Sequence, residues 1–383
     1  MKGRGWYSLI AGFVIMMAMG TVYSWSVFRP YVETQLSIGS ALSGFPYMTS
    51  LAFFALFMML TGRVLDKYQP KQLLTLAGIL LGIGYIGSSF ATNVWALTLF
   101  YGGCIGSAVG IAYGVPIKVV GMWFASKRGL MVGWVLLGFG MSPLVSAPLA
   151  SSLLQQVGLS QSLLILGVMF ALLLIVLGQF FQYPYPIATT SVKQDSLASL
   201  LSQPRFVGLY ITFLIGTLIG LTIIGLSTSI GIEYASIPAN QMALYISVFA
   251  IFNGLGRPLF GGLVDRLGVK NAMYISYGMI LFSSILMVVW AKPAVFVIAT
   301  VIYWLNLGGW LAIAPAATSK LFSNEKYSRN FGVVFTAYGV GALIGVSSSG
   351  LILDLLSSYK LLFLSIATLS ILGIFLVKKL IHF

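Results

Sequence analysis

One arginine stands inside an apolar segment, where a charge needs a chemical reason. Arg257 lies eight residues before Asp265, which places it roughly 10 Å along a helix from the polar end of that segment. A charge at that depth in a membrane costs several kcal/mol unless it faces water, a partner or an anion. Because a guanidinium matches a carboxylate with two parallel N–H donors, we predict that Arg257 binds an anion. The alternatives are an arginine that is paired with a carbonyl or helix end, or one that extends to the interface.

Acidic side chains that could carry protons are few. Glu233 and Asp354 stand at the outer ends of their apolar segments, and both are candidates for proton coupling, although both could be ordinary loop charges. Cys104 is the one cysteine of the chain, so neither a disulfide within the chain nor a zinc site of cysteines is expected. No constellation for hydrolysis, nucleophilic attack or metal binding stands within the apolar segments. The sequence therefore predicts no enzyme activity, no metal and no cofactor.

The composition indicates a membrane protein. Of the 383 residues, 59% are hydrophobic and 7% are charged, and the mean hydropathy is +1.00. Soluble domains carry about 25% charged residues. The formal charge of +14 would suggest nucleic acid in a soluble chain, but here the basic residues stand in short gaps between apolar runs. We therefore predict contact with a lipid bilayer and none with nucleic acid.

Apolar runs long enough to cross a bilayer occur throughout the chain. A spanning helix needs about 20 residues, and each run approaches or exceeds that length. The predicted spans are 6–28, 45–62, 72–91, 94–119, 130–153, 161–183, 206–232, 240–263, 271–291, 294–319, 329–353 and 360–379. The sequence thus predicts an all-α integral membrane protein with 12 transmembrane helices.

The distribution of basic residues orients these helices. With the N-terminus inside, 17 Lys and Arg residues fall on the inner side, whereas Arg29, Lys292 and Lys360 fall on the outer side. Such an excess marks cytoplasmic loops, so both termini are predicted to be cytoplasmic. The longest polar stretch is expected to be a cytoplasmic hinge at 184–205, between an N-terminal six-helix half at 1–183 and a C-terminal six-helix half at 206–383.

A repeated motif supports two halves of the same orientation. Gly62, Asp66, Lys67 and Lys71 follow the second apolar segment, and a similar motif recurs 199 residues later. The second copy consists of Gly261, Leu263, Asp265, Arg266, Gly268 and Lys270. Arg128, Gly138 and Gly140 likewise recur 201 residues later as Arg329, Gly339 and Gly341.

This motif resembles the loop between helices two and three of the major facilitator superfamily, Gly-x-Leu-x-Asp-Arg-x-Gly-x-Lys. The first copy departs from it at Gln69, where glycine is usual. The resemblance implies alternating access by rocking of two halves, with a conformational latch on the cytoplasmic side. The expected latch residues are Gly62, Asp66, Lys67, Lys71, Gly261, Asp265, Arg266, Gly268, Lys270, Arg128 and Arg329. The alternative is that these residues only anchor the inner loops.

Four further motifs resemble the oxalate:formate antiporter and monocarboxylate transporter group of that superfamily. They are Tyr23-Ser-Trp25-Ser-Val-Phe28-Arg29-Pro30, Ala112-Tyr113-Gly114, Trp123 to Leu130 leading into Gly138-Phe139-Gly140, and Asn253-Gly254-Leu-Gly256-Arg257-Pro258. The resemblance implies that Arg257 contacts a substrate carboxylate. Asn253 could orient Arg257 or bond a neighbouring helix. The aromatic candidates for substrate binding are Tyr23, Tyr113, Phe335 and Tyr338, although most aromatic residues of the chain must serve packing.

One departure from this group bears on the substrate. Oxalate-carrying members have a lysine in helix eleven, where this chain has Tyr338. A single cation suits one carboxylate better than two. We therefore expect secondary transport of a small monocarboxylate, such as lactate, pyruvate or formate, by proton symport or exchange with a counter-anion. Oxalate:formate exchange, export of a drug or another solute, and a transport-dead membrane sensor are the alternatives. A monomer in a bacterial inner membrane is expected.

Overall fold

The computed structural model describes residues 2–65, 67–185, 200, 202–322 and 327–381, and the described residues form helices and connecting loops without a strand. The chain divides into two compact units, which are described separately. The first comprises Met1–Ile38 and Leu42–Thr190, and the second comprises Gly39–Ala41 and Ser191–Phe383. The short segment Gly39–Ala41 thus packs with the second unit, while its neighbours in the chain pack with the first.

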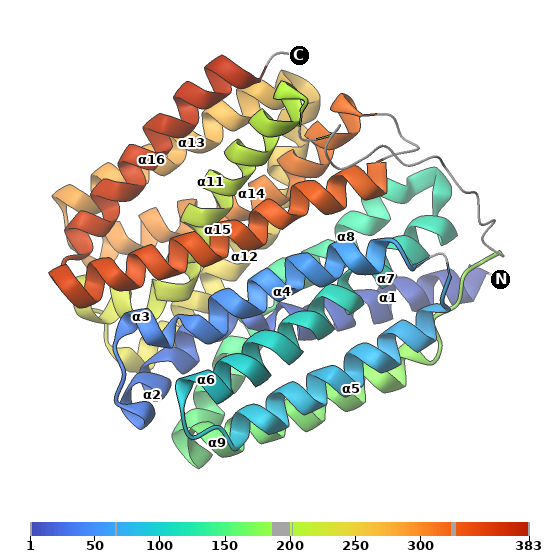
Figure 1. Cartoon of the computed structure of the whole chain (residues 1–383), viewed down its shortest axis with the longest axis horizontal. Coiled ribbons are helices and arrows are strands. Elements are labelled where there is room, and N and C mark those ends of the chain that lie inside the picture. Colours follow the sequence, from blue (N-terminus) through green and yellow to red (C-terminus); the bar gives the residue numbers. More distant parts are fainter. Residues whose placement is uncertain (1, 66, 186–199, 201, 323–326, 382–383) are drawn as a thin grey trace. The chain divides into compact units, whose positions relative to one another are not determined.

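The first unit is built from helices that follow one another with short connections (Figure 1). They are α1 (Lys2–Met19), a 3-10 turn (Gly20–Ser24), α2 (Trp25–Leu36), α4 (Phe45–Gly62), α5 (Pro70–Ser89), α6 (Val94–Leu97), a π-helical segment (Thr98–Ile105), α7 (Gly106–Trp123), a 3-10 turn (Ala125–Lys127), α8 (Arg128–Met141) and α9 (Pro143–Gly178). The four-residue α3 (Ser40–Ser43) begins in the segment Gly39–Ala41, which belongs to the second unit. Within the first unit, α5 and α9 lie side by side.

The second unit contains longer uninterrupted helices. They are α11 (Pro204–Ser229) with a π-helical end (Ile230–Tyr234), α12 (Ala239–Leu267), α13 (Val269–Val289), α14 (Pro293–Leu321), α15 (Tyr327–Leu356) and α16 (Tyr359–Leu380). The most extensive packing in this unit joins α12 to α14. That packing matters for function because α12 carries Arg257.

Eleven helical runs of the described chain are long and apolar enough to cross a membrane. One of them, Leu130–Gly178, has 49 residues, which would make roughly 74 Å of straight helix against a hydrocarbon core of about 30 Å. Gly158 interrupts it with φ 75° and ψ −179°, in a region that favours glycine. This run therefore contains two of the predicted spans, and the predicted all-α membrane fold is confirmed.

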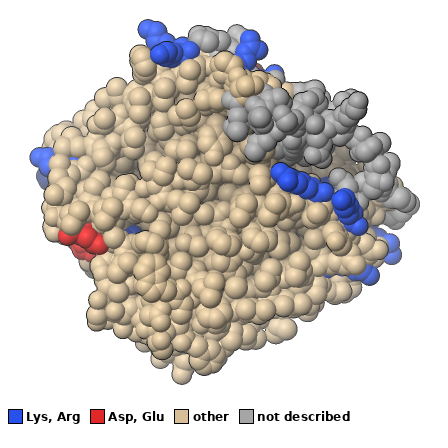
Figure 2. All heavy atoms as spheres, in the orientation of Figure 1, with Lys and Arg blue, Asp and Glu red and all other residues tan. Residues whose placement is uncertain are grey.

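Charge is distributed as a bilayer requires. On the face shown in Figure 2, the broad central area carries no Lys, Arg, Asp or Glu among the described residues. Many large apolar side chains are exposed, including Ile10 at 65% and Phe282 at 55%. Hydrocarbon can solvate such side chains whereas water cannot, so the protein is a multi-pass integral membrane protein.

Two glycines set the close approach of α12 to α14. A Cβ atom on Gly256 would lie 2.0 Å from the Leu305 carbonyl oxygen, and one on Gly308 would lie 1.9 Å from the Asn253 carbonyl oxygen. Both contacts are with backbone, which cannot rotate away. Small residues at such positions allow helices in membranes to pack at short distance. The position of Asn253 and Arg257 is thus fixed by glycine at the helix contact.

We expect Gly256→Ala to destabilise the second unit by about 3 kcal/mol, because the new methyl group forces α12 and α14 apart. Gly278→Ala is the matched control, since a Cβ atom at Gly278 in α13 meets nothing within 4 Å. Thermal unfolding of the purified protein in detergent measures both. Equal unfolding temperatures for the two variants would show that the contact does not control the packing.

Candidate anion-binding site

Arg257 and Asn253 lie on the same face of α12, one turn apart. Arg257 is 8% exposed and Asn253 is fully buried. Within the described chain, neither the amide oxygen nor the amide nitrogen of Asn253 has a hydrogen-bond partner. A buried polar group without a partner costs about 1–3 kcal/mol, so an unpartnered amide beside a guanidinium suits a ligand that can bond both.

Proline follows Arg257 directly and removes one helical hydrogen bond. Pro258 has no N–H, so the carbonyl of Gly254, four residues earlier, lacks its usual helical donor. The helix nevertheless continues to Leu267. The Gly254 carbonyl is therefore a backbone acceptor on the segment that carries Asn253 and Arg257. Together these groups can bind a carboxylate and an adjacent hydroxyl or keto group.

The aromatic candidates of the second unit form a stacked pair on α15. The rings of Phe335 and Tyr338 lie 5.0 Å apart with an interplanar angle of 12°. Phe213 of α11 approaches Phe335 at 6.3 Å. Phe335 is 1% exposed and Tyr338 is fully buried. The structure thus brings the two predicted residues together in a packed aromatic cluster.

The aromatic candidates of the first unit meet at Phe139, which belongs to the motif Gly138-Phe139-Gly140. Tyr23 and Tyr113 each place an edge against Phe139, at 5.2 Å in both cases, with interplanar angles of 87° and 89°. Tyr23 belongs to the 3-10 turn Gly20–Ser24, where a Cβ atom on Gly20 would lie 2.3 Å from the Phe139 carbonyl oxygen. Phe139 therefore joins the helices that carry both tyrosines.

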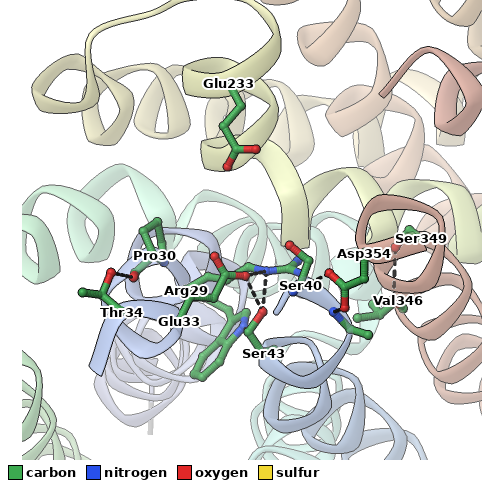
Figure 3. A network of polar contacts seen from close by, with 12 residues as sticks. Arg29, Pro30, Glu33, Thr34, Ser40, Ser43, Glu233, Val346, Ser349 and Asp354 are labelled. Carbon is green, nitrogen blue, oxygen red and sulfur yellow. Dashed lines mark hydrogen bonds and ion pairs between the residues drawn. The ribbon is translucent and has the colours of Figure 1, made fainter. Parts of the chain in front are cut away.

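The two candidates for proton coupling have different environments (Figure 3). Glu233 is exposed and accepts a hydrogen bond of 2.8 Å from the Tyr359 hydroxyl. Asp354 is also exposed, and its two oxygens accept from the backbone N–H groups of Ser40 and Ala41, at 2.8 Å each. The described side-chain contacts of Asp354 are with these peptide groups.

The side chain of Arg29, which the sequence assigns to the outer side of the membrane, is buried within the first unit. It is 1% exposed, and its Nε donates to Glu33 Oε1 at 3.1 Å and to Ser43 Oγ at 3.0 Å. The Ser43 hydroxyl also donates to Glu33 Oε1, at 2.5 Å (Figure 3). The spacing of four residues between Arg29 and Glu33 was the available sequence signal for this ion pair.

The predicted latch residues lie at helix ends. Gly62 ends α4, and Lys67 and Lys71 are exposed before and within the first turn of α5. Asp265 and Arg266 are exposed at the end of α12, which contains Gly261, and Lys270 is half-buried in α13. Gly268 has φ 83°, a conformation that favours glycine and explains the residue in the motif. Asp66 lies outside the described residues, as do the side chains of Arg128 and Arg329.

An apolar groove of about 390 Å³ lies elsewhere in the first unit, between α1 and α9. It is lined by Tyr7, Ile10, Ala11, Val14, Leu173, Val176 and Leu177. This lining offers no cation to a carboxylate, so the groove does not suit an anion.

Comparison with known proteins gives the family. Residues 9–314 and 217–382 match the Major Facilitator Superfamily. The chain is 26% identical over 355 residues to the oxalate:formate antiporter of Oxalobacter formigenes, across 90% of this chain and 84% of that protein. It is 25% identical over 346 residues to monocarboxylate transporter 12 of Homo sapiens, across 79% of this chain and 66% of that protein. The crystal structure of the nucleoside transporter NupG has a similar fold, with a TM-score of 0.73, 18% identity and 99% of each chain covered. The chain therefore belongs to the major facilitator superfamily, whose members are transporters and not enzymes.

Proposed function

We propose that this transporter carries a small monocarboxylate of the lactate, pyruvate or formate type by alternating access. The observation that supports this most is the burial of Arg257 within a membrane-spanning helix, one turn from the unpartnered amide of Asn253. The similarity to the oxalate:formate antiporter and to a monocarboxylate transporter points to the same class of substrate. In this proposal the guanidinium binds the carboxylate, and the amide bonds it or an adjacent oxygen.

The number of available charges favours one carboxylate over two. Among the described residues, Arg29 and Arg257 are the buried cationic side chains. Arg29 is already neutralised by Glu33 at 3.1 Å. Arg257 therefore supplies the positive charge of the proposed site, and Tyr338 stands where oxalate carriers of the group have lysine. A dicarboxylate would bring a second negative charge without a matching cation.

The remaining predicted residues have supporting roles in this proposal. Tyr23, Tyr113, Phe335 and Tyr338 pack against the carbon chain of the substrate or bond its oxygens. Glu233 and Asp354 are the candidates for proton coupling, and Glu233 accepts a hydrogen bond from the Tyr359 hydroxyl. The latch residues act on the predicted cytoplasmic side. A monomer in a bacterial inner membrane remains the proposed working form.

Counterflow in proteoliposomes tests the proposed substrate class. Vesicles are loaded with unlabelled acid, and entry of labelled lactate, pyruvate, formate and oxalate is followed with and without a pH gradient. We expect counterflow of a monocarboxylate to exceed that of oxalate, and the pH gradient separates symport from exchange. Preference for oxalate would contradict the assignment of one cation to the site. Transport of a neutral or cationic solute with no counterflow of any acid would reject the carboxylate proposal.

Asn253→Leu is expected to raise the KM for the transported acid about tenfold, with a smaller effect on the maximal rate. Leucine has a similar volume but cannot donate a hydrogen bond to the ligand, and one such bond to a charged group is worth about 1.5–3 kcal/mol. Thr368→Val is the control, because Thr368 is exposed on α16 and its hydroxyl donates to the Leu364 carbonyl of its own helix. Initial rates of counterflow against concentration provide the measurement. An unchanged KM in Asn253→Leu would mean that the Asn253 amide contributes to helix packing and not to substrate binding.

A further inference from the structure

The groove between α1 and α9 in the first unit has an apolar lining along its length. It has a volume of about 390 Å³ and is lined by aliphatic side chains and by the ring of Tyr7. The Tyr7 hydroxyl donates to the Leu177 carbonyl at 3.3 Å, so it already has an acceptor. Ile10 and Val176 of the lining are 65% and 55% exposed, so the groove is open at the protein surface. Such a lining suits an apolar chain and not a polar solute.

The depth of the groove matches one leaflet of a bilayer. On α1 the lining extends from Tyr7 to Val14, which is about 10 Å of helix. Arg4 stands one turn before Tyr7, so Arg4 and Val14 are separated by about 15 Å along the helix. One leaflet supplies half of a hydrocarbon core of about 30 Å. The groove therefore has the depth that an acyl chain of one leaflet reaches.

A positive charge stands beyond the end of the groove that is predicted to be cytoplasmic. Arg4 and Tyr7 lie on the same side of α1, because residues three apart on a helix are neighbours. The Arg4 side chain is exposed, and its guanidinium donates to Gln182 Oε1 at 3.3 Å. This partner is a neutral amide, and no described Asp or Glu forms an ion pair with Arg4. The guanidinium can therefore bind the phosphate of a lipid headgroup.

Aromatic side chains surround the same end of the groove. Trp6 is 53% exposed, and Phe180, at 62% exposure, places an edge against Tyr7 at 5.5 Å. The Trp123 indole N–H donates to the Gln182 carbonyl at 3.1 Å. Trp and Tyr are enriched where headgroups meet the hydrocarbon core. The end of the groove thus lies where a phospholipid changes from acyl chain to headgroup.

We propose that this groove binds one acyl chain of an anionic phospholipid, and that Arg4 binds the phosphate of the same lipid. The lining takes the uncharged chain, and the charge is bound one helical turn beyond it. A lipid held in this way contacts both α1 and α9 and stabilises the first unit. The inference goes beyond the transport function, and it involves neither Arg257 nor the transported solute.

Native mass spectrometry of the full-length chain in detergent tests the headgroup contact, with dioleoyl phosphatidylglycerol and dioleoyl phosphatidylcholine as probes. We expect the first phosphatidylglycerol to bind about fivefold more tightly than phosphatidylcholine, because one basic residue attracts its net charge. Arg4→Gln should reduce this preference to near unity. Arg63→Gln is the matched control, since it removes an exposed arginine at the end of α4. An undiminished preference in Arg4→Gln would overturn the proposal.

A photoactivatable diazirine on the acyl chain of phosphatidylglycerol tests the groove itself. In the wild type we expect crosslinks to concentrate in peptides that cover 5–14 and 170–178. Val14→Phe places a larger side chain in the groove and should lower these crosslinks several-fold. Ile83→Phe, at an exposed position of α5, is the matched control, and thermal unfolding verifies that both variants are folded.

The source of the bound phosphate is tested by competition. Glycerol 3-phosphate carries the phosphate without acyl chains, so it should not displace the lipid at concentrations that saturate with phosphatidylglycerol. Displacement by glycerol 3-phosphate, or wild-type crosslinks spread evenly over the exposed helices, would overturn the proposal. Crosslinking that Val14→Phe leaves unchanged would reduce the site to a surface charge and would also overturn it. None of these readouts needs transport, so the carboxylate proposal is tested separately.

Discussion

Arg257→Ala is expected to lower counterflow of the transported monocarboxylate at least about 100-fold. The guanidinium is the buried cation that Glu33 does not neutralise, and losing one partner of a buried charge pair costs about 2–5 kcal/mol. Alanine supplies no donor, and water in a site of this kind restores little of the interaction. The measurement is the initial rate of counterflow at equal amounts of reconstituted protein.

Two further variants separate binding from folding. Arg257→Lys retains the charge but loses the planar pair of donors, so we expect intermediate counterflow with a raised KM. Arg205→Ala removes an exposed arginine at the start of α11 and should leave transport close to wild type. Gel filtration and thermal unfolding verify that each variant is folded. Counterflow by Arg257→Ala at the wild-type rate would show that Arg257 on α12 does not bind the transported anion.

Glu33→Ala is expected to destabilise the first unit by about 3 kcal/mol, which lowers the apparent unfolding temperature by roughly 6–12 °C. The substitution leaves Arg29, at 1% exposure, without its carboxylate and removes the acceptor of the Ser43 hydroxyl. Removing one partner of a buried ion pair destabilises a fold more than replacing both partners with apolar residues, because the remaining charge stays desolvated. Thermal unfolding in detergent measures the effect.

The double variant Arg29→Met with Glu33→Leu distinguishes the charge effect from lost packing. If the cost of Glu33→Ala comes from an uncompensated guanidinium, the double variant should recover most of the lost stability. Gln35→Ala, at an exposed position of α2, controls for changes to the helix itself. A double variant that is less stable than Glu33→Ala would mean that Arg29 and Glu33 act mainly through contacts other than their mutual charge.

The membrane helices could be predicted from the sequence because the apolar core of a bilayer requires long apolar segments. Apolar runs of about 20 residues are the signal, and each predicted span has a counterpart in the structure. Gly158 separates two spans by conformation alone, and the predicted gap from 154 to 160 placed the break correctly. The positive φ of Gly268 likewise has a sequence signal, since glycine is usual at this position of the motif, although the first copy has Gln69 there.

Contacts between distant segments could not be predicted in this way. Counting basic residues assigned Arg29 to a side of the membrane but could not predict the burial of its side chain, because the count uses position along the chain and does not show that Ser43 lies close enough to bond it. The partners of Asp354 are backbone N–H groups, which every residue except proline has and which leave no sequence signature. The role of Phe139 between Tyr23 and Tyr113 follows from three helices meeting, which hydropathy does not record.

Equilibrium binding of a labelled acid to the purified protein tests most directly whether Arg257 binds the substrate. Binding at equilibrium does not depend on ion coupling or on release of the substrate across the membrane. The acid is the monocarboxylate preferred in counterflow, and the proteins are the wild type, Arg257→Ala and Arg205→Ala. We expect one saturable site per chain in the wild type and in Arg205→Ala. In Arg257→Ala we expect the Kd for the acid to be at least about 100-fold higher. Undiminished binding by Arg257→Ala would contradict this expectation.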